Sequence, residues 1–222
     1  MCSPAIPDLD RTAMERGLYA NAQAAIANRD AIGFNATAIN RESALALVCD
    51  NMAILKAAGI YEACLLHAFT GCRVNHRQWS ERVISGMFDY GDRAAFLAAG
   101  NPLPGPGPFR IYRGVSGHGR ARRLHGLSWT SSLSKACWFS TRFARPNPAV
   151  LCADVDANEV IAYWNGRSEQ EFIVQPSQWT RLSLAADELQ QQAALGQAEM
   201  DEVHAASRRS LMDQANRLRQ NR

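Results

Sequence analysis

The stretch Phe109-Arg110-Ile111-Tyr112-Arg113-Gly114-Val115 alternates between apolar and polar side chains directly after a segment rich in proline and glycine. Successive residues of a strand point to opposite faces, so Phe109, Ile111 and Arg113 share one face. Five further short apolar runs follow it, separated by turns, at residues 126–131, 149–155, 160–164, 169–175 and 179–184. Six strands of this length and spacing predict a compact, mostly antiparallel β core.

Helices are expected on both sides of this β core. Apolar residues recur at spacings of three and four through residues 8–100, which predicts helices at 43–58, 60–70 and 77–88, the first ending at Gly59. One helix is expected within the core, over 132–143. A C-terminal amphipathic helix is predicted from residue 185, with a stripe made of Met200, Val203, Ser207, Leu211, Ala215 and Leu218.

The chain is therefore expected to be an α+β protein with a helical N-terminal lobe. Four prolines and three glycines lie between residues 100 and 108, which disfavours both helix and central strand there. The predicted division is a helical lobe at 1–100, a linker at 101–108, a β core at 109–184 and a C-terminal helix at 185–222.

Composition indicates an ordinary globular protein and excludes several other classes. Hydrophobic residues make up 47% and charged residues 20% of the 222 residues, which argues against disorder and against a fibrous repeat. The formal net charge of +3 is too small to indicate nucleic-acid binding by itself. No apolar run approaches the roughly 18 to 20 residues that span a bilayer, so no membrane insertion is expected.

The cysteines and histidines give no metal-binding pattern. The six cysteines are scattered without a Cys-x-x-Cys pair, and the five histidines form no pair at zinc-ligand spacing. We therefore expect no metal and reduced thiols. With no signal-like N-terminus, a cytoplasmic location is expected, in a bacterial cell or in a host cell.

Two of the expected strands carry polar residues where a strand core prefers apolar ones. Arg113 ends an otherwise apolar face and needs an anion, and Gly114 after it allows a ligand or another backbone to approach closely. In the run 126–131, Ser128 and Thr130 share one face while Trp129 points to the other. Ordinary alternatives are a surface ion pair for the arginine and cross-strand hydrogen bonds for the hydroxyls.

A third strand, expected at 169–175, carries two carboxylates. Glu169 and Glu171 are predicted to lie on the same face as Ile173, with the Cα atoms of the two glutamates about 6.6 Å apart. The ordinary alternative is that Glu-x-Glu marks the solvated face of a strand. None of the three polar elements identifies an enzyme by itself.

Together and in this order, the three elements resemble the Arg-Ser-Glu class of ADP-ribosyltransferases, of bacterial or phage type. The resemblance rests on Tyr112-Arg113-Gly114, on Ser128-Trp129-Thr130-Ser131 followed by a helix, and on the glutamate block 169–176 with its apolar run and proline. It covers roughly residues 109–184. Trp129 departs from the small middle residue of the family motif; it is expected to point away from the cleft and to change packing only.

The resemblance implies a role for each residue in binding and cleaving NAD. Glu171 corresponds to the catalytic glutamate, which bonds the 2′-hydroxyl of the nicotinamide ribose while oxocarbenium character develops. Arg113 corresponds to the ligand of the pyrophosphate, and Gly114 offers backbone contacts to the nicotinamide amide. Ser128 orients Glu171, and Thr130 supports the same strand.

The resemblance also implies an acceptor site beside Glu171. Glu169 is expected to orient and help deprotonate the incoming nucleophile, and a Glu-x-Glu pair tends to accompany arginine acceptors in this family. The preceding segment, with Trp164, Asn165 and Arg167, occupies the place of the acceptor-recognition loop. Trp164 is equally well interpreted as a core tryptophan at a strand end.

The implied activity is mono-ADP-ribosyl transfer, in which NAD is consumed and nicotinamide is released. A protein arginine is the expected acceptor, and a nucleic-acid acceptor stays open. Two alternatives remain: NAD glycohydrolysis, and a non-catalytic binding or inhibitor module on the same fold. The related fold that removes RNA 2′-phosphates agrees less well with the glutamate pair. A toxin, a phage-borne modifier or a secreted effector would all be compatible with these residues.

Overall fold

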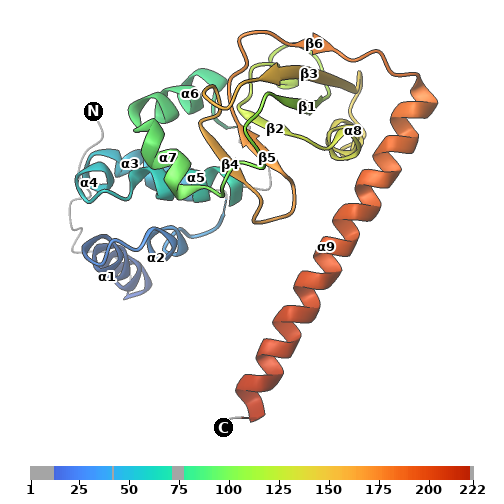
Figure 1. Ribbon diagram of the computed structural model, residues 1–222. Coiled ribbons are helices and arrows are strands. Elements are labelled where there is room, and N and C mark those ends of the chain that lie inside the picture. Colours follow the sequence, from blue (N-terminus) through green and yellow to red (C-terminus); the bar gives the residue numbers. More distant parts are fainter. Residues whose placement is uncertain (1–12, 42, 72–77, 221–222) are drawn as a thin grey trace. The chain divides into compact units, whose positions relative to one another are not determined.

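The computed structural model describes residues 13–41, 43–71 and 78–220 (Figure 1). The chain divides into two compact units, Met1–Pro102 and Leu103–Arg222, and the division falls within the segment predicted as a linker. The first unit is helical, and the second holds a β-sheet together with helices that pack on it. The expected α+β class, with an N-terminal helical lobe and a C-terminal helix, is confirmed.

Seven helices make up the described part of the first unit. They are α1 (Ala13–Ala27), α2 (Ala31–Ala36), α3 (Ala44–Asp50), α4 (Met52–Ala57), α5 (Tyr61–Gly71), α6 (Glu81–Tyr90) and α7 (Arg93–Ala99). Helix α5 lies at the centre, where Tyr61, Leu65 and Leu66 are fully buried. The Tyr61 hydroxyl donates to the carbonyl of Met87 at 2.7 Å, which links α5 to α6. The core of this unit is thus formed by α5, which the neighbouring helices enclose.

The single helix predicted over 43–58 is wrong in one respect, because the structure breaks it at Asn51. Asn51 has φ −116° and ψ 13°, outside the helical region, and separates α3 from α4. Its side-chain amide donates to the carbonyl of Leu47 at 2.8 Å, and such local bonding competes with the helical ladder. The apolar stripe nevertheless continues, since Leu45, Val48 and Leu55 are all buried.

The other helix signals in this unit agree with the structure. Gly59 adopts φ +72°, and the amide of Ile60 reaches back to the carbonyl of Leu55, as in a glycine-terminated helix. Helix α6 begins after Ser80, whose hydroxyl accepts from the amide of Val83. The first residue of the predicted helix 77–88 lies outside the described residues.

Among the described residues of the second unit, six strands form one antiparallel sheet. They are β1 (Phe109–Val115), β2 (Ser128–Thr130), β3 (Ala149–Val155), β4 (Ala162–Trp164), β5 (Glu171–Ile173) and β6 (Thr180–Arg181). The spatial order is β4-β5-β2-β1-β3-β6. The short strand β2 joins the halves of the sheet, because it pairs with β1 through Thr130 and with β5 along its whole length.

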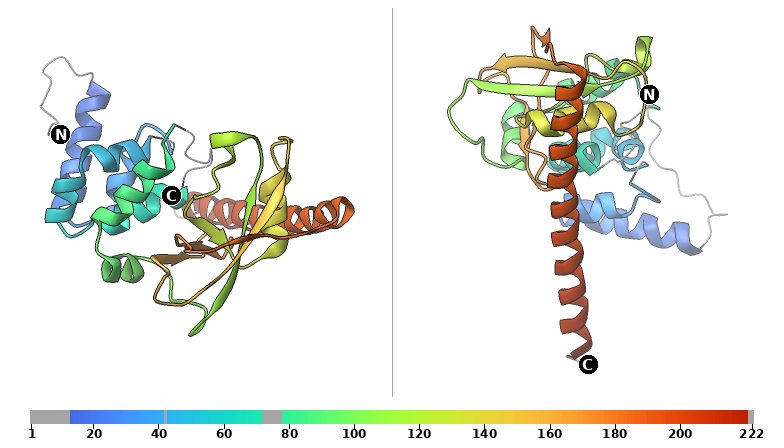
Figure 2. Two further views of the ribbon diagram at one scale, coloured as in Figure 1. Left: turned by 90° about the horizontal axis from the view of Figure 1, so that it is seen from above. Right: turned by 90° about the vertical axis from the view of Figure 1, so that its right-hand side faces the viewer.

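Both faces of the sheet carry packed side chains, and helix α8 (Leu133–Thr141) runs alongside the sheet (Figure 2). On one face, β1 and β3 contribute to a cluster centred on Ile111, Trp129, Leu151 and Phe172. The other face is covered by α8, which begins after the cap residue Ser132 close to the predicted start. The alternation predicted for β1 therefore separates two cores, one of them between the sheet and a helix.

Helix α9 (Ala186–Gln220) lies against α8 along its N-terminal half, and its C-terminal half extends beyond the sheet (Figure 1). Leu189 and Ala193 join the core of α8. A Cβ at Gly196 would lie 2.3 Å from the carbonyl oxygen of Ser134, so glycine permits this close approach. Of the predicted stripe, Met200 is buried and Val203 half-buried. The side chains of its other members, Ser207, Leu211, Ala215 and Leu218, lie outside the described ones.

Candidate active site

Strands β1, β2 and β5 bring three predicted site residues into one chain of hydrogen bonds. The guanidinium of Arg113 donates through Nη1 to the carbonyl oxygen of Ser128. The Ser128 hydroxyl in turn donates to Oε1 of Glu171 at 2.5 Å. The register explains this meeting, because Thr130 pairs with Glu171 and Ser128 lies two residues away on the same face of β2.

Arg113 is buried, with 9% of its surface exposed. Besides the Ser128 carbonyl, it donates to the carbonyl of Arg123 at 3.3 Å. A Cβ at Gly126 would lie 2.0 Å from Nη2, so this glycine makes room for the guanidinium. In the structure, Arg113 thus holds the connection between β1 and β2 by its backbone carbonyls, and an anion would have to compete with them.

Gly114 and Trp129 both face packed protein. A Cβ on Gly114 would lie 2.1 Å from the carbonyl oxygen of Ala136, so the missing side chain lets α8 approach β1. Trp129 is 2% exposed, belongs to the cluster on the opposite face from the Ser128 hydroxyl, and donates through Nε1 to the carbonyl of Gly126. The larger residue in the motif is accommodated by the core, as expected from its alternation.

The Glu171 carboxylate is buried with only half of its acceptor capacity used. The residue is 5% exposed. Oε1 accepts from Ser128, whereas Oε2 is buried and has no hydrogen-bond partner among the described residues. Burial, reinforced by the negative charge of Glu169, raises the pKa of Glu171 to about 7, against the opposing effects of Arg167, Ser128 and Arg113. A buried oxygen without a partner is costly, which makes it a candidate ligand-binding atom.

Glu169 does not lie on the strand that was predicted to carry it. Strand β5 begins only at Glu171, and Gln170 adopts φ +50°, in the left-handed region. The alternation of a strand ends there, so the common face and the strand spacing predicted for the two glutamates do not apply. Glu169 remains buried, at 8% exposure, and its charge still acts on Glu171 from the preceding loop.

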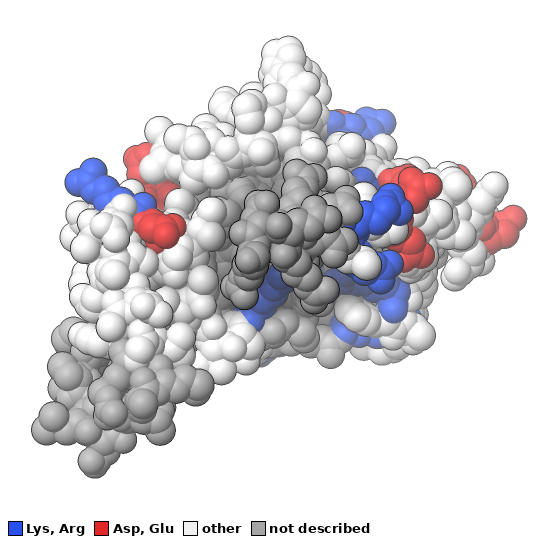
Figure 3. Space-filling view, turned by 90° about the horizontal axis from the view of Figure 1, so that it is seen from below, with Lys and Arg blue, Asp and Glu red and all other residues white. Residues whose placement is uncertain are grey.

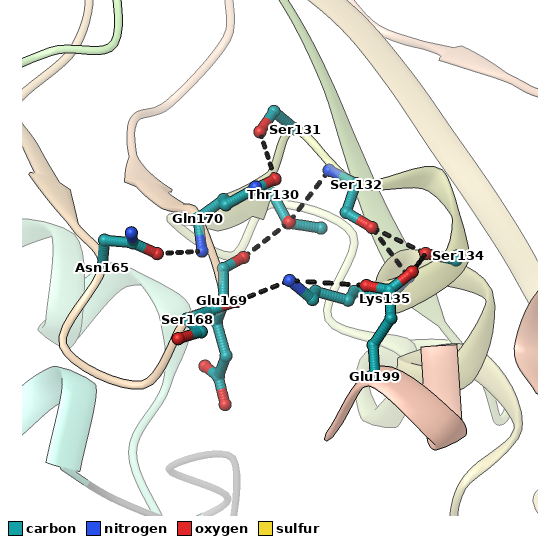
Figure 4. Close-up of polar contacts among 10 residues, drawn as sticks. All are labelled: Thr130, Ser131, Ser132, Ser134, Lys135, Asn165, Ser168, Glu169, Gln170 and Glu199. Atoms are coloured by element: carbon teal, nitrogen blue, oxygen red, sulfur yellow. Dashed lines mark hydrogen bonds and ion pairs between the residues drawn. The ribbon is translucent and has the colours of Figure 1, made fainter. Parts of the chain in front are cut away.

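The loop 165–170 that carries Glu169 is fixed by its neighbours (Figure 4). The Thr130 hydroxyl donates to the carbonyl of Glu169 at 2.7 Å, and the Ser131 hydroxyl donates to the side-chain carbonyl of Gln170 at 2.9 Å. The Asn165 side chain accepts from the amide of Gln170 at 3.2 Å. Thr130 therefore supports the site by holding this loop, a role that its position on β2 allows.

The three residues of the predicted acceptor loop occupy different positions around the glutamates. Trp164 ends β4 and is the register partner of Glu171, which places the two on neighbouring strands. Its indole packs on Gly166, where a Cβ would lie 2.9 Å from the ring. Arg167 donates to Oε2 of Glu169 at 2.7 Å, so the Glu169 carboxylate is ion-paired with its own loop.

One basic residue near the glutamates was missed by the sequence reasoning. Arg142 follows α8, and its guanidinium lies 4.6 Å from the ring centres of both Phe139 and Phe143. Burial lowers its pKa, and the charge of Glu169 acts in the opposite direction. The signal in the sequence was an arginine with aromatic residues four and three positions before it, at 138 and 139, and one directly after it, at 143.

The charged surface residues that the structure describes do not indicate a second site. Figure 3 shows Lys and Arg side chains interspersed with Asp and Glu side chains on one face, in agreement with the net charge of +3. Among the described residues, no helix is both long and apolar enough to cross a membrane. Comparison of the chain with protein-family models, with curated proteins and with solved structures finds no match.

Proposed function

We propose that the chain is an NAD-dependent mono-ADP-ribosyltransferase with Glu171 as its catalytic carboxylate. The observation that carries the proposal is the state of this carboxylate: Ser128 orients one oxygen, and the other is buried without a partner among the described residues. A hydroxyl donated by a ligand would satisfy that second oxygen. The 2′-hydroxyl of the nicotinamide ribose is such a donor, next to the carbon that reacts.

The chemistry requires Glu171 in its ionised form. As the bond between the anomeric carbon and the nicotinamide nitrogen breaks, its electron pair leaves with nicotinamide and positive charge develops on the ribose. A carboxylate already desolvated by the protein stabilises that charge more strongly than one in water. The raised pKa of about 7 keeps a substantial ionised fraction only near and above neutral pH.

Glu169 is proposed to serve the acceptor. A nucleophile forms the new bond to the anomeric carbon and loses a proton, and a carboxylate beside Glu171 can take that proton. The bond between Arg167 and Glu169 supports a guanidinium acceptor, because this carboxylate already accepts from a guanidinium at 2.7 Å. A protein arginine is accordingly the preferred acceptor.

The pyrophosphate of NAD needs a cation, and two arginines are candidates. Arg113 has the role implied by the family resemblance, but its donors bond two backbone carbonyls. No such bonds to backbone carbonyls are seen for Arg142, whose guanidinium packs on aromatic rings and lies within electrostatic reach of Glu169 in the described part of the chain. We therefore propose Arg142 as a contact to the pyrophosphate, with Arg113 holding β2 in place.

NAD glycohydrolysis is the second candidate, and it is the expected reaction if the Arg167–Glu169 ion pair stays closed. An acceptor guanidinium has to displace Arg167 from Glu169, whereas a water molecule is small enough to react without doing so. With water as the nucleophile, the products are ADP-ribose and nicotinamide. The balance between the two reactions then depends on how readily the ion pair opens.

Incubation with NAD labelled in its adenylate half, with and without a bacterial lysate, tests the proposal. Nicotinamide release together with label on protein supports transfer, and mass spectrometry then identifies the modified residue. Release of free ADP-ribose alone supports glycohydrolysis. Absence of nicotinamide release from a folded protein under both conditions would overturn both candidates.

A further inference from the structure

Lys135, on α8, connects three segments that are distant in sequence (Figure 4). Its ammonium donates to the carbonyl oxygen of Ser168 at 2.5 Å, in the loop that carries Glu169. It also lies 3.5 Å from Oε2 of Glu199, on α9. The other oxygen of Glu199 accepts from the hydroxyl of Ser134 at 2.8 Å. The C-terminal helix, α8 and the loop 165–170 thus meet at one buried ammonium.

From this geometry we propose that Lys135 is a positioning residue for acceptor transfer, and that Glu199 of the C-terminal helix holds it in place. The proposal rests on the function proposed above. It assigns to α9 a part in the site: by way of Lys135, the helix fixes the loop that presents Glu169 to the acceptor.

Burial explains why Lys135 needs Glu199. The lysine side chain is 7% exposed and that of Glu199 47% exposed, so the pair joins a desolvated cation to a carboxylate at the rim. An ammonium in such a place is stable only with a counter-charge and with its donors bonded. Among the described residues, Glu199 is the carboxylate that forms an ion pair with it.

The backbone of the loop explains why it needs Lys135. Ser168 and Gln170 adopt φ +55° and +50°, although neither is glycine. Such conformations cost about 1 kcal/mol or more each and persist only where surrounding contacts hold them. Thr130 and Ser131 hold residues 169 and 170, and Lys135 holds Ser168. Removal of the ammonium would free the part of the loop that directly precedes Glu169.

The docking of α9 makes this support independent of the distal half of the helix. Gly196 packs on the backbone of Ser134, and Trp138 donates to the side chain of Gln197 at 2.5 Å. These contacts precede Glu199 on the same helix and fix its position against α8. They also provide a matched control, because the Trp138–Gln197 bond joins α8 to α9 without touching the loop.

The test compares Lys135→Met with Gln197→Ala, measuring acceptor transfer and NAD hydrolysis separately. For Lys135→Met, kcat for transfer is expected to fall on the order of tenfold to a hundredfold, since a displacement of about 1 Å at a reacting group has effects of this size. Hydrolysis should change less than about threefold, because Glu171 and Ser128 keep their bond. Gln197→Ala should leave the ratio of transfer to hydrolysis unchanged. An unchanged ratio in Lys135→Met would overturn the proposal.

Glu199→Gln gives a second route if Lys135→Met does not fold. Its amide can still accept from Ser134 but supplies no charge, so transfer should fall in the same direction by a smaller factor. In the double variant, the Glu199 substitution should add nothing to the loss already caused by Lys135→Met. If the losses of transfer caused by the two substitutions instead multiply in the double variant, Glu199 does not act through Lys135.

The pH profile separates positioning from simple destabilisation. The charged groups that act on Glu171 are Glu169, Arg167 and Arg113. If Glu169 moves away in Lys135→Met, its repulsion weakens and the acid limb of the hydrolysis profile shifts to lower pH. Partial unfolding reduces the amplitude without that shift.

Amide hydrogen exchange distinguishes failure of this proposal from failure of the proposed function. Residues 165–171 should exchange faster in Lys135→Met and in Glu199→Gln than in Gln197→Ala, whether or not the protein turns over NAD. If these variants exchange faster but the protein does not turn over NAD, only the proposed function is contradicted. Equal exchange in an active chain would contradict only the role of Lys135.

Discussion

The two units of the chain each bury a glutamate with little exposed surface and treat it in opposite ways. Glu62 in the helical unit and Glu171 in the sheet unit are both 5% exposed. Glu62 accepts from the ammonium of Lys56 and from the amide of Asp92, the latter at 2.7 Å. Burial opposes its ionisation, but these bonds outweigh burial and lower its pKa. For Glu171, burial and the neighbouring charge of Glu169 raise the pKa to about 7.

The difference teaches how a structural carboxylate can be distinguished from a candidate catalytic one. At Glu62 a cation and a backbone amide satisfy the charge, and the pair holds helices together. At Glu171 a neutral hydroxyl supplies one bond and a second carboxylate adds repulsion, so the group is left with unused capacity. Low exposure alone therefore does not mark a functional site; the depth of burial and the partners of the carboxylate together do.

The largest expected effect is the loss of catalysis in Glu171→Gln. The amide cannot supply the negative charge that the oxocarbenium-like state requires, so nicotinamide release should fall by about a hundredfold to a thousandfold or more. A coupled assay of nicotinamide release measures this directly. Glu62→Gln is the matched control, which should keep turnover per folded molecule; equal loss in both variants would erase the distinction between the two glutamates.

The same substitution should stabilise the protein at alkaline pH. Because the pKa of Glu171 is raised in the folded protein, the folded state holds this proton more tightly than the unfolded chain does. The resulting stability is complete below the ordinary pKa of a glutamate and is lost as the pH rises through about 7. The glutamine side chain cannot ionise, so Glu171→Gln should gain about 1 to 3 kcal/mol in unfolding free energy at pH 8. Urea denaturation at pH 5 and pH 8 measures the gain, which should shrink at the lower pH.

Removal of the partner of Glu62 should have the opposite effect. Lys56→Met leaves a buried carboxylate with one backbone donor and should cost about 1 to 3 kcal/mol at pH 7, allowing for the partial exposure of Lys56. Because the pKa of Glu62 is lowered, its ionised form stabilises the fold fully above the ordinary pKa of a glutamate. This stabilisation is lost as the pH falls from that value through the lower pKa of the folded state. Denaturation at pH 7 and pH 3.5 tests this, with a smaller cost expected at the lower pH; a cost that does not shrink in acid would argue against an ionic cause.

The pH dependence of activity should follow the raised pKa of Glu171. Below about pH 7 the rate should fall tenfold per pH unit, as expected for one group that must be ionised. In Ser128→Ala the hydrogen bond that favours the charge is lost, so the acid limb should move up by about one pH unit. A profile of kcat/KM from pH 5 to 9 decides both points, and a downward shift in Ser128→Ala would contradict the assigned bond.

The smallest expected effect concerns Arg167. Because its guanidinium occupies Glu169, Arg167→Ala should lower KM for an arginine acceptor by about twofold to fivefold, a gain limited by the weak net energy of a half-exposed ion pair. Agmatine, a small guanidino compound, serves as the test acceptor. Arg167→Lys, which keeps the charge, provides the control; a higher KM in the alanine variant would instead assign Arg167 to acceptor binding.

Local signals predicted much of the secondary structure. The alternation in 109–115 and the apolar run 149–155 predicted β1 and β3 with their observed bounds, and Ser132 capped α8 next to its predicted start. The shorter strands were predicted too long; β5, for example, begins only at Glu171, after the left-handed Gln170. Asn51 broke a helix through a side-chain bond that periodicity does not report.

The candidate site was predicted in its parts and only partly in its geometry. Ser128 and Glu171 meet as expected, since both follow strand alternation on adjacent strands. Glu169 leaves the strand because Gln170 turns left-handed, and no residue type at that position announces it. Arg142 and Lys135 were not singled out, because their importance lies in what surrounds them in space.

The sequence by itself determined which segments are helices and strands, and which face of β1 and β2 each side chain occupies, because these properties follow from residues a few positions apart. Only the tertiary structure decided the chemical state of the glutamates. The hydroxyl that bonds Glu171 belongs to Ser128, 43 residues away in the sequence. The ammonium that bonds Ser168, next to Glu169, belongs to Lys135, 33 residues away. Burial and charge at such sites are sums over distant segments, so they exist only once the chain has folded.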